Sequence, residues 1–416
     1  MRHQRFFIPG ILFLFIFAAF VFTSGQRPSY AFKMVCDFVE ERYYLADENL
    51  TKWHDLCLEV GDALPLFISE DETVRALRQV LGILPVSHLD VYSPVEEKRA
   101  WQGIGEDTGL RAELVQDYFV VTQVLSESPN RDQIKKGDIV FKINGEYVTR
   151  ANQVMFEAGE WAVLRLKSVV SKSDGFVQSD FDEFTVQAKK AEINVDASNK
   201  VYQYAPEVWV LQLGSFKAEW FKELNWKELV GQFIDKPQLV IDLRGNLGGD
   251  FAALLRALSP FYCQPTLIGY INAPRREVKE PMAFPDAVEA KKQFEVLEVA
   301  RQVMLITYEG YGCFKGKLSV LVDENTGSSA EIFAQAMKEK GVRVWGERTK
   351  GEVVMSVWYD ISYILGKGYS ISVPEATYST VRNNDLEAYG VIPDRELYYQ
   401  LQYELHGKDS WIEALR

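Results

Sequence analysis

The sequence predicts an α/β (α+β) fold, in which a core with a mixed sheet carries a helical N-terminal lead-in and an inserted β-rich module. Three changes of hydrophobic pattern support this prediction. Apolar residues recur every three or four positions from about residue 32 to 87, as on one face of a helix. Short alternating runs follow, and then apolar strands alternate with helical segments. We therefore expect four segments: 1–31, 32–100, 101–193 and 194–416.

Each segment has its own evidence. The lead-in contains "FVEERYYLADENLTKWHDLCLEV" and "ETVRALRQVLGIL", which have helical spacing. The module contains the strand-like runs "YFVVTQVL", "DIVFKING", "WAVLRLKSVV" and "DEFTVQA". In the last segment "VWVLQLGSF", "QLVIDLRGN" and "KLSVLVDE" alternate with helical runs, which predicts a largely parallel or mixed sheet covered on both faces. We expect the charged piece 273–307 to be a helical insertion without a strand.

Length and charge exclude some functional classes. With 416 residues, 47% of them hydrophobic, the chain exceeds the size of a single core. The formal net charge is −13, and no basic block occurs beyond the extreme N-terminus. Because nucleic acids are held by clustered Lys and Arg, we expect no nucleic-acid partner. The spacing of Cys and His suggests no metal site, and we expect no cofactor.

The first residues have the pattern of an export signal. Arg2 and Arg5 precede an uncharged apolar run at 6–22, and Ser29-Tyr30-Ala31 is a small-x-small site for a signal peptidase. Since 17 apolar residues are at the short end of what spans a bilayer, an uncleaved anchor is the alternative. Either outcome carries the body across the membrane. We predict a periplasmic or extracellular protein that contacts the membrane only if this segment is uncleaved.

Four cysteines follow the export segment: Cys36, Cys57, Cys263 and Cys313. An even number in an exported chain permits two disulfides, in one of three pairings. We predict the pairs that are near in sequence, Cys36 with Cys57 and Cys263 with Cys313. Each disulfide would close a loop and thereby raise the free energy of unfolding by roughly 3 to 4 kcal/mol, by the loop-entropy relation. Buried free thiols are the alternative.

A glycine-rich turn follows one of the predicted buried strands, in "VIDLRGNLGGD" at 240–250. Such a turn exposes backbone N–H groups at the carboxyl edge of a sheet, where α/β folds bind ligands. Gly248 and Gly249 would let a substrate carbonyl approach the main chain and form half of an oxyanion hole. A plain strand-to-helix turn is the alternative. The absence of a following G-K-[ST] excludes a phosphate loop.

A second strand and turn, in "KLSVLVDENTGSSAEIFAQAMKEKG" at 317–341, carries two serines where a helix begins. Ser328 with Glu331 three residues later fits a capping box, so Ser328 can be a plain N-cap. A serine at a helix N-terminus also lies where the dipole and unsatisfied N–H groups favour developing negative charge. The N–H of Ser329 would then complete the oxyanion hole. The local pattern alone leaves both interpretations open.

Together, these two motifs and four other segments resemble the superfamily of carboxy-terminal processing (tail-specific) peptidases and the tricorn protease core. The other segments are "LPVSHLDVYSP", "QGIGED", "SESPNRDQIKKGDIVFKING" and "EAYGVIPD". The resemblance covers most of the chain after the export segment. It implies a serine peptidase core with a PDZ domain at about 101–193. Gly103, Ile104 and Gly105 take the place of the loop with which that domain caps a peptide carboxylate.

Carried over by position, the resemblance puts the nucleophile at Ser328. The tail-specific branch uses a lysine base in the turn after the next strand, but that position holds Glu352. Lys350 lies two residues earlier and shares a face of an extended strand with it, which makes Lys350 an alternative base. The sequence "ERTKGE" surrounds it with charges, and this indicates a solvated setting.

The tricorn-like branch uses a histidine instead, with a preceding serine and a distant glutamate. Ser87 and His88 in "VSHLDVYSP" match the first two, and Glu387 in "EAYGVIPD" matches the third. The resemblance thus implies His88 as general base and acid for Ser328, with Glu387 acting through Ser87 to orient the histidine.

The leading hypothesis is an exported serine endopeptidase that cleaves protein or peptide substrates captured by its PDZ domain. A Ser-Lys peptidase that uses Lys350 is one alternative. A catalytically inactive adaptor that binds peptides is another, and the departure at Glu352 motivates it. A carbohydrate or lipid hydrolase on a similar core would need a G-x-S-x-G elbow, which this sequence lacks.

Overall fold

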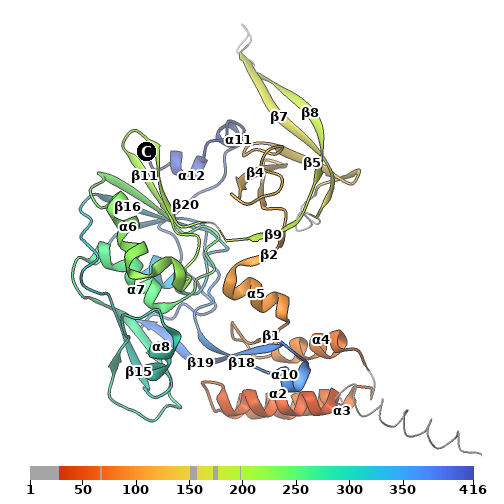
Figure 1. Ribbon diagram of the computed structural model, residues 1–416, viewed down its shortest axis with the longest axis vertical. Helices are drawn as coiled ribbons and strands as arrows, with labels where there is room; N and C mark the ends of the chain where they lie inside the picture. The colour runs from red at the N-terminus through yellow and green to blue at the C-terminus, as the bar shows by residue number, and fades with distance from the viewer. Residues whose placement is uncertain (1–27, 66–67, 150–156, 172–176, 197) are drawn as a thin grey trace, which may run out of the picture. The chain divides into compact units, whose positions relative to one another are not determined.

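The computed structural model describes residues 28–65, 68–149, 157–171, 177–196 and 198–416 (Figure 1). Most of the predicted export segment, 1–27, lies outside the described residues. Its last residues belong to the first described helix, α2 (Pro28–Arg42), so the predicted cleavage site at Ser29-Tyr30-Ala31 is helical. Within the part of the chain that is described, every helix is too short or too polar to cross a membrane.

The chain divides into two compact units, residues 1–94 with 356–375, and residues 95–355 with 376–416. The elements of the first unit are α2, α3 (Glu48–Ala63), α4 (Glu70–Leu81), β1 (Asp90–Tyr92), β18 (Met355–Asp360), α10 (Ser362–Leu365) and the first half of β19 (Ser370–Thr380). The sequence pattern assigns 356–375 to the C-terminal segment. The structure groups it with the lead-in because its apolar side chains, such as Ile364 and Ile371, are buried in the same core as α2–α4.

Apolar faces and helix caps explain how the first unit forms. Phe32 of α2 is fully buried, and Gly61 of α3 leaves room for it, since a Cβ there would lie 2.5 Å from that of Phe32. Helix α4 begins at Ser69 with a capping box, in which the Ser69 N–H donates to a Glu72 carboxylate oxygen at 2.8 Å. The first predicted disulfide, Cys36–Cys57, is confirmed, and both of its residues are fully buried between α2 and α3.

A six-stranded sheet forms the centre of the second unit, in the order β10-β11-β12-β16-β17-β20. The strands are β10 (Lys200–Ala205), β11 (Val208–Gln212), β12 (Gln238–Asp242), β16 (Lys317–Val322), β17 (Arg343–Gly346) and β20 (Arg395–Glu396). Only the β10–β11 pairing is antiparallel, so the predicted mixed sheet is confirmed. Strands β12 and β16 are parallel neighbours, with Asp242 opposite Leu321. The turns that follow them therefore meet at one edge of the sheet.

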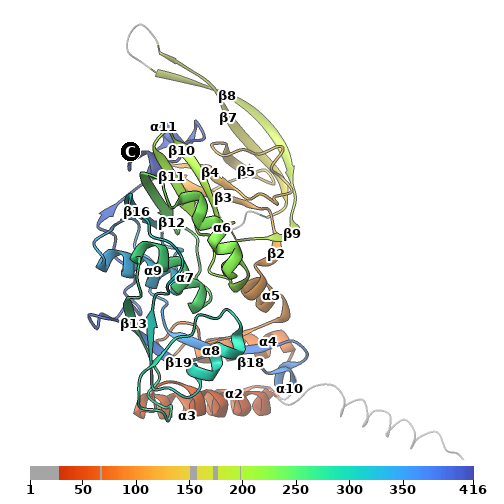
Figure 2. The same ribbon diagram turned by 60° about the vertical axis from the view of Figure 1, so that its left-hand side comes forward.

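Helices follow the strands of this sheet, as Figures 1 and 2 show. They are η1 (Ala218–Phe221), α6 (Glu223–Phe233), α7 (Phe251–Tyr262), α9 (Ser329–Glu339), α11 (Leu401–Glu404) and α12 (Ser410–Glu413). Helix α7 follows β12, α9 follows β16, and the two helices pack together. Helix α7 is nearly all buried, with Asp250 as its N-cap.

The predicted β-rich module is present in the second unit and follows α5 (Pro94–Gln102). Its strands are β2 (Ile104–Asp107), β3 (Leu110–Val115), β4 (Tyr118–Val124), β5 (Ile139–Ile143), β6 (Glu146–Tyr147), β7 (Gly159–Ser171), β8 (Val177–Ala188) and β9 (Ala191–Asn194). They form a sheet in the order β3-β4-β5-β7-β8, with β6 on β5, and a separate β2–β9 ribbon. We call this part the β module. Figure 1 shows the long β7–β8 hairpin extending from its sheet.

The charged piece 273–307 differs from its prediction. It contains the expected helix, α8 (Ala290–Leu297), but also β14 (Met282–Ala283) and β15 (Gln302–Ile306). These strands form a sheet with β13 (Leu267–Asn272) and the second half of β19. The expectation of no strand was wrong because β15 is only five residues long, and its alternation of buried Val303 and Leu305 is hidden among charged neighbours. The second predicted disulfide, Cys263–Cys313, is confirmed and encloses this piece.

Removal of the buried disulfide tests its contribution. The double variant Cys36→Ala/Cys57→Ala frees a loop with a sequence separation of 21. We expect it to lower the free energy of unfolding by roughly 3 kcal/mol, since the unfolded chain regains loop entropy. Denaturant titration followed by circular dichroism measures this loss. Unchanged stability of the double variant, against the wild type under the same oxidising conditions, would contradict the prediction.

Candidate functional site

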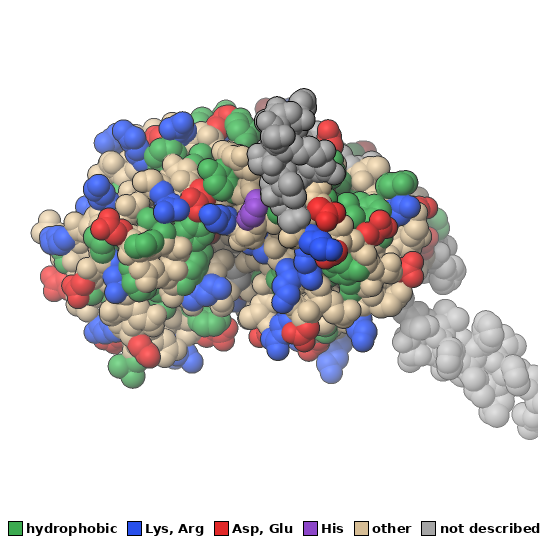
Figure 3. All heavy atoms as spheres, turned by 90° about the horizontal axis from the view of Figure 1, so that it is seen from above, with side chains coloured by type: hydrophobic (Ala, Val, Ile, Leu, Met, Phe, Trp, Pro, Cys, Tyr) green, Lys and Arg blue, Asp and Glu red, His purple; other side chains and the backbone are tan. Residues whose placement is uncertain are grey.

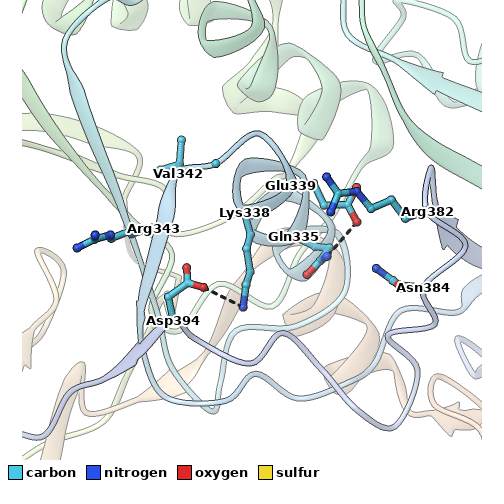
Figure 4. Close-up of a pocket in the computed structure, with 9 residues that line it drawn as sticks. Gln335, Lys338, Glu339, Val342, Arg343, Arg382, Asn384 and Asp394 are labelled. Carbon is cyan, nitrogen blue, oxygen red and sulfur yellow. Dashed lines mark hydrogen bonds and ion pairs between the residues drawn. The ribbon is translucent and has the colours of Figure 1, made fainter.

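Two hollows of the second unit are candidate sites. The smaller, about 390 Å³, lies at the C-terminal end of α9 (Figure 4). Two contacts join residues of its lining: Lys338 pairs with Asp394 at 3.3 Å, and Gln335 donates to Glu339 at 3.0 Å. The larger, about 1670 Å³, is lined by both the β module and the core. The glycine-rich turn after β12 is part of its wall, so we place the candidate site there.

Ser328 is held at the head of α9 in an unusual backbone conformation. Strand β16 ends at Val322, and a five-residue turn leads to Ser328, the N-cap of the helix. The φ of Ser328 is 55° and its ψ is −129°, a combination that residues other than glycine rarely adopt. Its N–H donates to a Glu331 carboxylate oxygen at 3.0 Å, and the Glu331 N–H donates to the Ser328 carbonyl at 2.9 Å. Such strain persists where the surrounding structure enforces it, often at functional sites.

The glycine-rich turn packs directly against this serine. A Cβ on Gly248 would lie 2.7 Å from the Ser328 Cβ and 2.9 Å from the Ser329 nitrogen. A Cβ on Gly249 would lie 2.5 Å from the Phe216 carbonyl oxygen. Both positions also have positive φ, so each requires glycine. The structure therefore brings together the three residues predicted to form the oxyanion hole.

The three predicted donors are not equivalent. The Gly248 N–H already donates to Asn246 Oδ1 at 2.8 Å. Among the described residues, the N–H groups of Gly249 and Ser329 have no hydrogen-bond partner. Backbone N–H groups of this kind beside a serine can stabilise an oxyanion. Gly249 and Ser329 are therefore the available donors, and Gly248 contributes close approach rather than a hydrogen bond.

Asn246 is a residue that the sequence reasoning missed. It is fully buried, and its side-chain amide donates to the Leu213 carbonyl at 2.8 Å. Its own carbonyl accepts from the Gly327 N–H at 2.9 Å, which joins the glycine-rich turn to the serine turn. A polar residue between a buried strand and a glycine pair is the signal that could have identified it, because a buried amide needs partners.

The carboxylate of Glu331 joins three segments of the chain. Oε1 accepts from Thr349 Oγ1 at 2.5 Å and from the Gly351 N–H at 2.7 Å. Oε2 accepts from the N–H groups of Glu352, at 2.9 Å, and Ser328. The side chain is fully buried, and burial raises its pKa although these hydrogen bonds oppose the shift. Glu331 thus holds both the turn that carries Ser328 and the segment where the sequence suggests an alternative base.

Lys350, the alternative base, lies along the serine turn with its ammonium group paired. Its Nζ is 3.3 Å from a carboxylate oxygen of Glu352, and the two side chains are 31% and 43% exposed. Its Cδ would lie 3.1 Å from a Cβ on Gly327. The side chain of Lys350 is therefore partly solvated, as the sequence indicates. A lysine needs burial to favour its neutral form and act as a base, and Lys350 lacks such burial.

Glu387 is attached to the same segment as Glu331. Its Oε2 accepts from the N–H groups of Val353, at 2.8 Å, and Val354, at 3.2 Å. The next residue, Ala388, has a φ of 63° and donates its N–H to the Gly351 carbonyl at 2.8 Å. The carboxylate is therefore fixed by main-chain donors in the second unit.

Ser87 and His88 form the predicted pair in the first unit. His88 Nδ1 lies 2.9 Å from Ser87 Oγ, and both residues are half-buried. His88 has a φ of 61°, so it too is a residue other than glycine in the left-handed region. A hydrogen bond at one ring nitrogen helps to orient the imidazole.

The predicted carboxylate loop of the β module has a different structure. Ile104 and Gly105 belong to strand β2 and pair with β9. The Gly103 N–H donates to the Arg99 carbonyl at 2.9 Å, at the end of helix α5. This N–H is therefore engaged by α5, which continues directly into the ribbon, and the role of Gly103, Ile104 and Gly105 as a carboxylate loop stays a prediction.

Carboxylates of the core and the β module gather near the serine turn, which the sequence did not predict. Burial raises the pKa of Glu113 on β3 to about 7, with Glu324 and Asp323 adding to the shift. Burial and a hydrogen bond to Glu324 raise the pKa of Glu347 to about 8. Among the residues that the structure describes, no group of Asp, Glu, His and Cys is arranged to hold a metal ion.

Arg244 compensates part of this negative charge. Its side chain is only 11% exposed and pairs with Asp242 at 2.7 Å and Asp409 at 2.8 Å. Arg244 holds the pKa of Asp409 below its usual range. It follows β12 directly, so this ion triad anchors the start of the glycine-rich turn to the C-terminal part of the chain.

Comparison with known proteins identifies relatives for most of this chain. A family model described as peptidase family S41 matches residues 208–397. A CtpA-like serine protease of Staphylococcus epidermidis is 23% identical over 80% of the chain, and the chain spans 65% of its length. A carboxyl-terminal-processing protease of Picosynechococcus is 25% identical over 83% of the chain and 78% of its own length.

Solved structures share the fold. A protein of Bacteroides fragilis assigned to the S41 proteases aligns over 92% of this chain and 95% of its own, with a TM-score of 0.61 and 15% identity. The tricorn protease aligns over 94% of this chain and 36% of its own, with a TM-score of 0.51 and 17% identity. The residues matched by the family model, 208–397, include the glycine-rich turn and Ser328.

Gly248→Ala tests the close approach of the glycine-rich turn. The added Cβ would displace Ser328, so we expect kcat to fall on the order of 100-fold or more, as when oxyanion stabilisation is lost. Gly245→Ala is the matched control. Gly245 also has positive φ, 72°, in the same turn, but nothing lies within 4 Å of a Cβ there. Equal losses of kcat in the two variants would show that backbone strain, not displacement of Ser328, is responsible.

Glu347→Gln tests the carboxylate cluster through pH. The pKa of Glu347, about 8, is raised above its ordinary value of 4.5, so the folded protein binds more protons than the unfolded chain between these values. Stability therefore falls as pH rises through this range. Glutamine cannot ionise, so we expect the Tm of the variant, relative to wild type, to increase from pH 5 to pH 9. The exposed Glu146→Gln is the control, and a pH-independent Tm difference would contradict the assignment.

Proposed function

Because the chain belongs to peptidase family S41, we propose that it hydrolyses peptide bonds of protein or peptide substrates with Ser328 as the nucleophile. One observation carries this proposal. The strained Ser328 at the head of α9 lies beside two backbone N–H groups, of Gly249 and Ser329, that have no partner among the described residues. A nucleophile next to preorganised donors is what acyl transfer requires.

His88 is the proposed general base and acid. It would take the proton of the Ser328 hydroxyl as the acyl-enzyme bond forms and give it to the leaving amine. The contact of its Nδ1 with Ser87 supports this role, because it fixes the ring orientation. Glu387, fixed by the N–H groups of Val353 and Val354, supplies the carboxylate that orients the histidine through Ser87.

Capture of the substrate is assigned to the β module, which we propose is a PDZ domain. Strand β3 ends the order of its sheet and lines the large cavity together with Gly248 and Gly249. An extended peptide can add to such an edge by main-chain hydrogen bonds. Ile104, the middle residue of the proposed carboxylate loop, also lines this cavity.

Export is the proposed destination of the chain. Two disulfides and no free cysteine in the described residues fit an oxidising compartment, such as the periplasm or the cell exterior. The N-terminal pattern supplies the route, as a cleaved signal or as an anchor.

Four single variants test the mechanism on an unstructured protein substrate. We expect Ser328→Ala and His88→Ala to reduce kcat by about 1000-fold or more, as removal of a triad member does. We expect Lys350→Ala and the matched control Ser329→Ala to stay within about threefold of wild type, since neither side chain moves a proton in this scheme. Cleavage and its rate are read on gels and by fluorescence.

The same set separates the alternatives. Cleavage by all four variants at the rate of the wild type would contradict the mechanism. Loss in Ser328→Ala and Lys350→Ala, with His88→Ala unaffected, would establish the Ser-Lys version. A wild type that binds peptides, cleaves none and resists a fluorophosphonate probe at Ser328 would be the inactive adaptor.

A further inference from the structure

The large cavity adjoins the glycine-rich turn that packs against Ser328. Its wall includes Gly248, Gly249 and Asp250 of the core, and the edge strand β3 of the β module. Its volume, about 1670 Å³, exceeds the roughly 300 to 1,000 Å³ of small-molecule pockets. It has room for several residues of an extended peptide, so the chemistry of its wall bears on which peptides fit.

The wall is biased toward negative charge. Acidic side chains outnumber basic ones on it, ten to six. Figure 3, by contrast, shows acidic and basic side chains interspersed over the outer face that it draws. A low-dielectric hollow lined by one sign of charge concentrates ligands of the opposite sign.

The basic side chains of the wall are already engaged. Arg244 pairs with two carboxylates, Lys217 with Asp196, and Lys136 with Asp409 at 3.5 Å. Arg99 and Arg111 both pair with Asp107, at 3.3 and 2.9 Å. The sixth, Lys200, has its ammonium group 5.7 Å from the centre of the Tyr202 ring. Five of the six therefore offer little to an incoming anion.

Several acidic side chains of the wall have no such partner. Within the described residues, Glu113, Asp250 and Asp323 make no ion pair. Asp323 accepts only from the Gly245 N–H and nearby groups of its own turn, and Asp250 from Gln293 and the first turn of α7. Burial raises the pKa of each of the three carboxyl groups. A cation beside them would relieve an unfavourable burial of negative charge.

Two of these carboxylates belong to the turns that carry the proposed oxyanion hole. Asp250 follows Gly249 directly, and Asp323 begins the turn that leads to Ser328. Uncompensated negative charge there opposes the oxyanion that forms during acyl transfer. A positive side chain of the substrate would offset this repulsion, so its benefit would increase from the bound state to the transition state.

We propose that this cavity selects peptide segments that carry Lys or Arg, with Glu113 on the β module side and Asp250 and Asp323 on the core side as the residues that recognise the positive charge. The inference rests on the proposed function and specifies its substrate class. The occupant is a peptide rather than a small cation, because β3 offers an unpaired strand edge within the described residues and the cavity is large enough for an extended chain.

Binding to Ser328→Ala tests the charge preference without cleavage. The probes are three fluorescent unstructured peptides of one length that differ only in three positions, occupied by Lys, Gln or Glu. By fluorescence anisotropy in 50 mM NaCl, we expect the Kd of the Lys peptide to be about tenfold or more below that of the Glu peptide. We expect the difference between the Kd values of the Lys and Glu peptides to become smaller at 300 mM NaCl, because salt screens exposed charges. An equal or tighter Kd for the Glu peptide would overturn the proposal.

Variants identify the residues. In the Ser328→Ala background, Glu113→Gln is expected to reduce the preference, measured as the Kd of the Glu peptide divided by the Kd of the Lys peptide, by about threefold. Glu146→Gln, at an exposed glutamate outside the cavity, is expected to leave this preference unchanged. Equal effects of the two would overturn the assignment of Glu113. Cleavage of the Gln peptide by wild type reports the proposed function separately. If wild type does not cleave the Gln peptide, the proposed function fails but the binding result still stands. If wild type cleaves all three peptides at the same rate, only the charge preference is refuted.

Discussion

The buried carboxylate of Glu331 is the interaction on which the site depends. One side chain accepts four hydrogen bonds, from Ser328, Thr349, Gly351 and Glu352, with no exposure to solvent. Hydrogen bonds to a buried charge are stronger than neutral ones, and breaking one partner leaves the charge unsatisfied. The strained backbone of Ser328 can persist because this network outweighs its cost. The segment 351–354, whose N–H groups at Val353 and Val354 fix Glu387, is held by the same network through Gly351 and Glu352.

Much of the fold follows from short-range pattern. The sequence allowed four features to be predicted from residues that lie near one another: the strand and turn before Gly248, the strand and turn before Ser328, and the two disulfide pairs. Parallel pairing of β12 with β16 then brings the two turns to one edge of the sheet. The meeting of Gly248 with Ser328 is thus a consequence of topology that two local patterns already imply.

The rest depends on contacts between distant segments. Nothing near Glu113 in sequence indicates that it lies close to Asp323 and Glu324, which belong to the turn after β16, some 210 residues later. The capping glutamate Glu331 was predicted for its own helix, but its other partners are 18 to 21 residues away. Burial of Asn246 likewise requires the position of Leu213. Tertiary hydrogen bonds of this kind produce no periodic pattern of residues, so they cannot be predicted from the sequence.

The ion triad of Arg244 has a consequence for the order of events during synthesis. Asp242 and Arg244 emerge from the ribosome together, but Asp409, which completes the triad, follows 165 residues later. Until then, one buried guanidinium has only half of its partners, and the turn that it anchors is not fully held. The segment that carries Asp409 therefore completes the anchoring of the glycine-rich turn, and this edge of the sheet is fully held only after Asp409 has been synthesised.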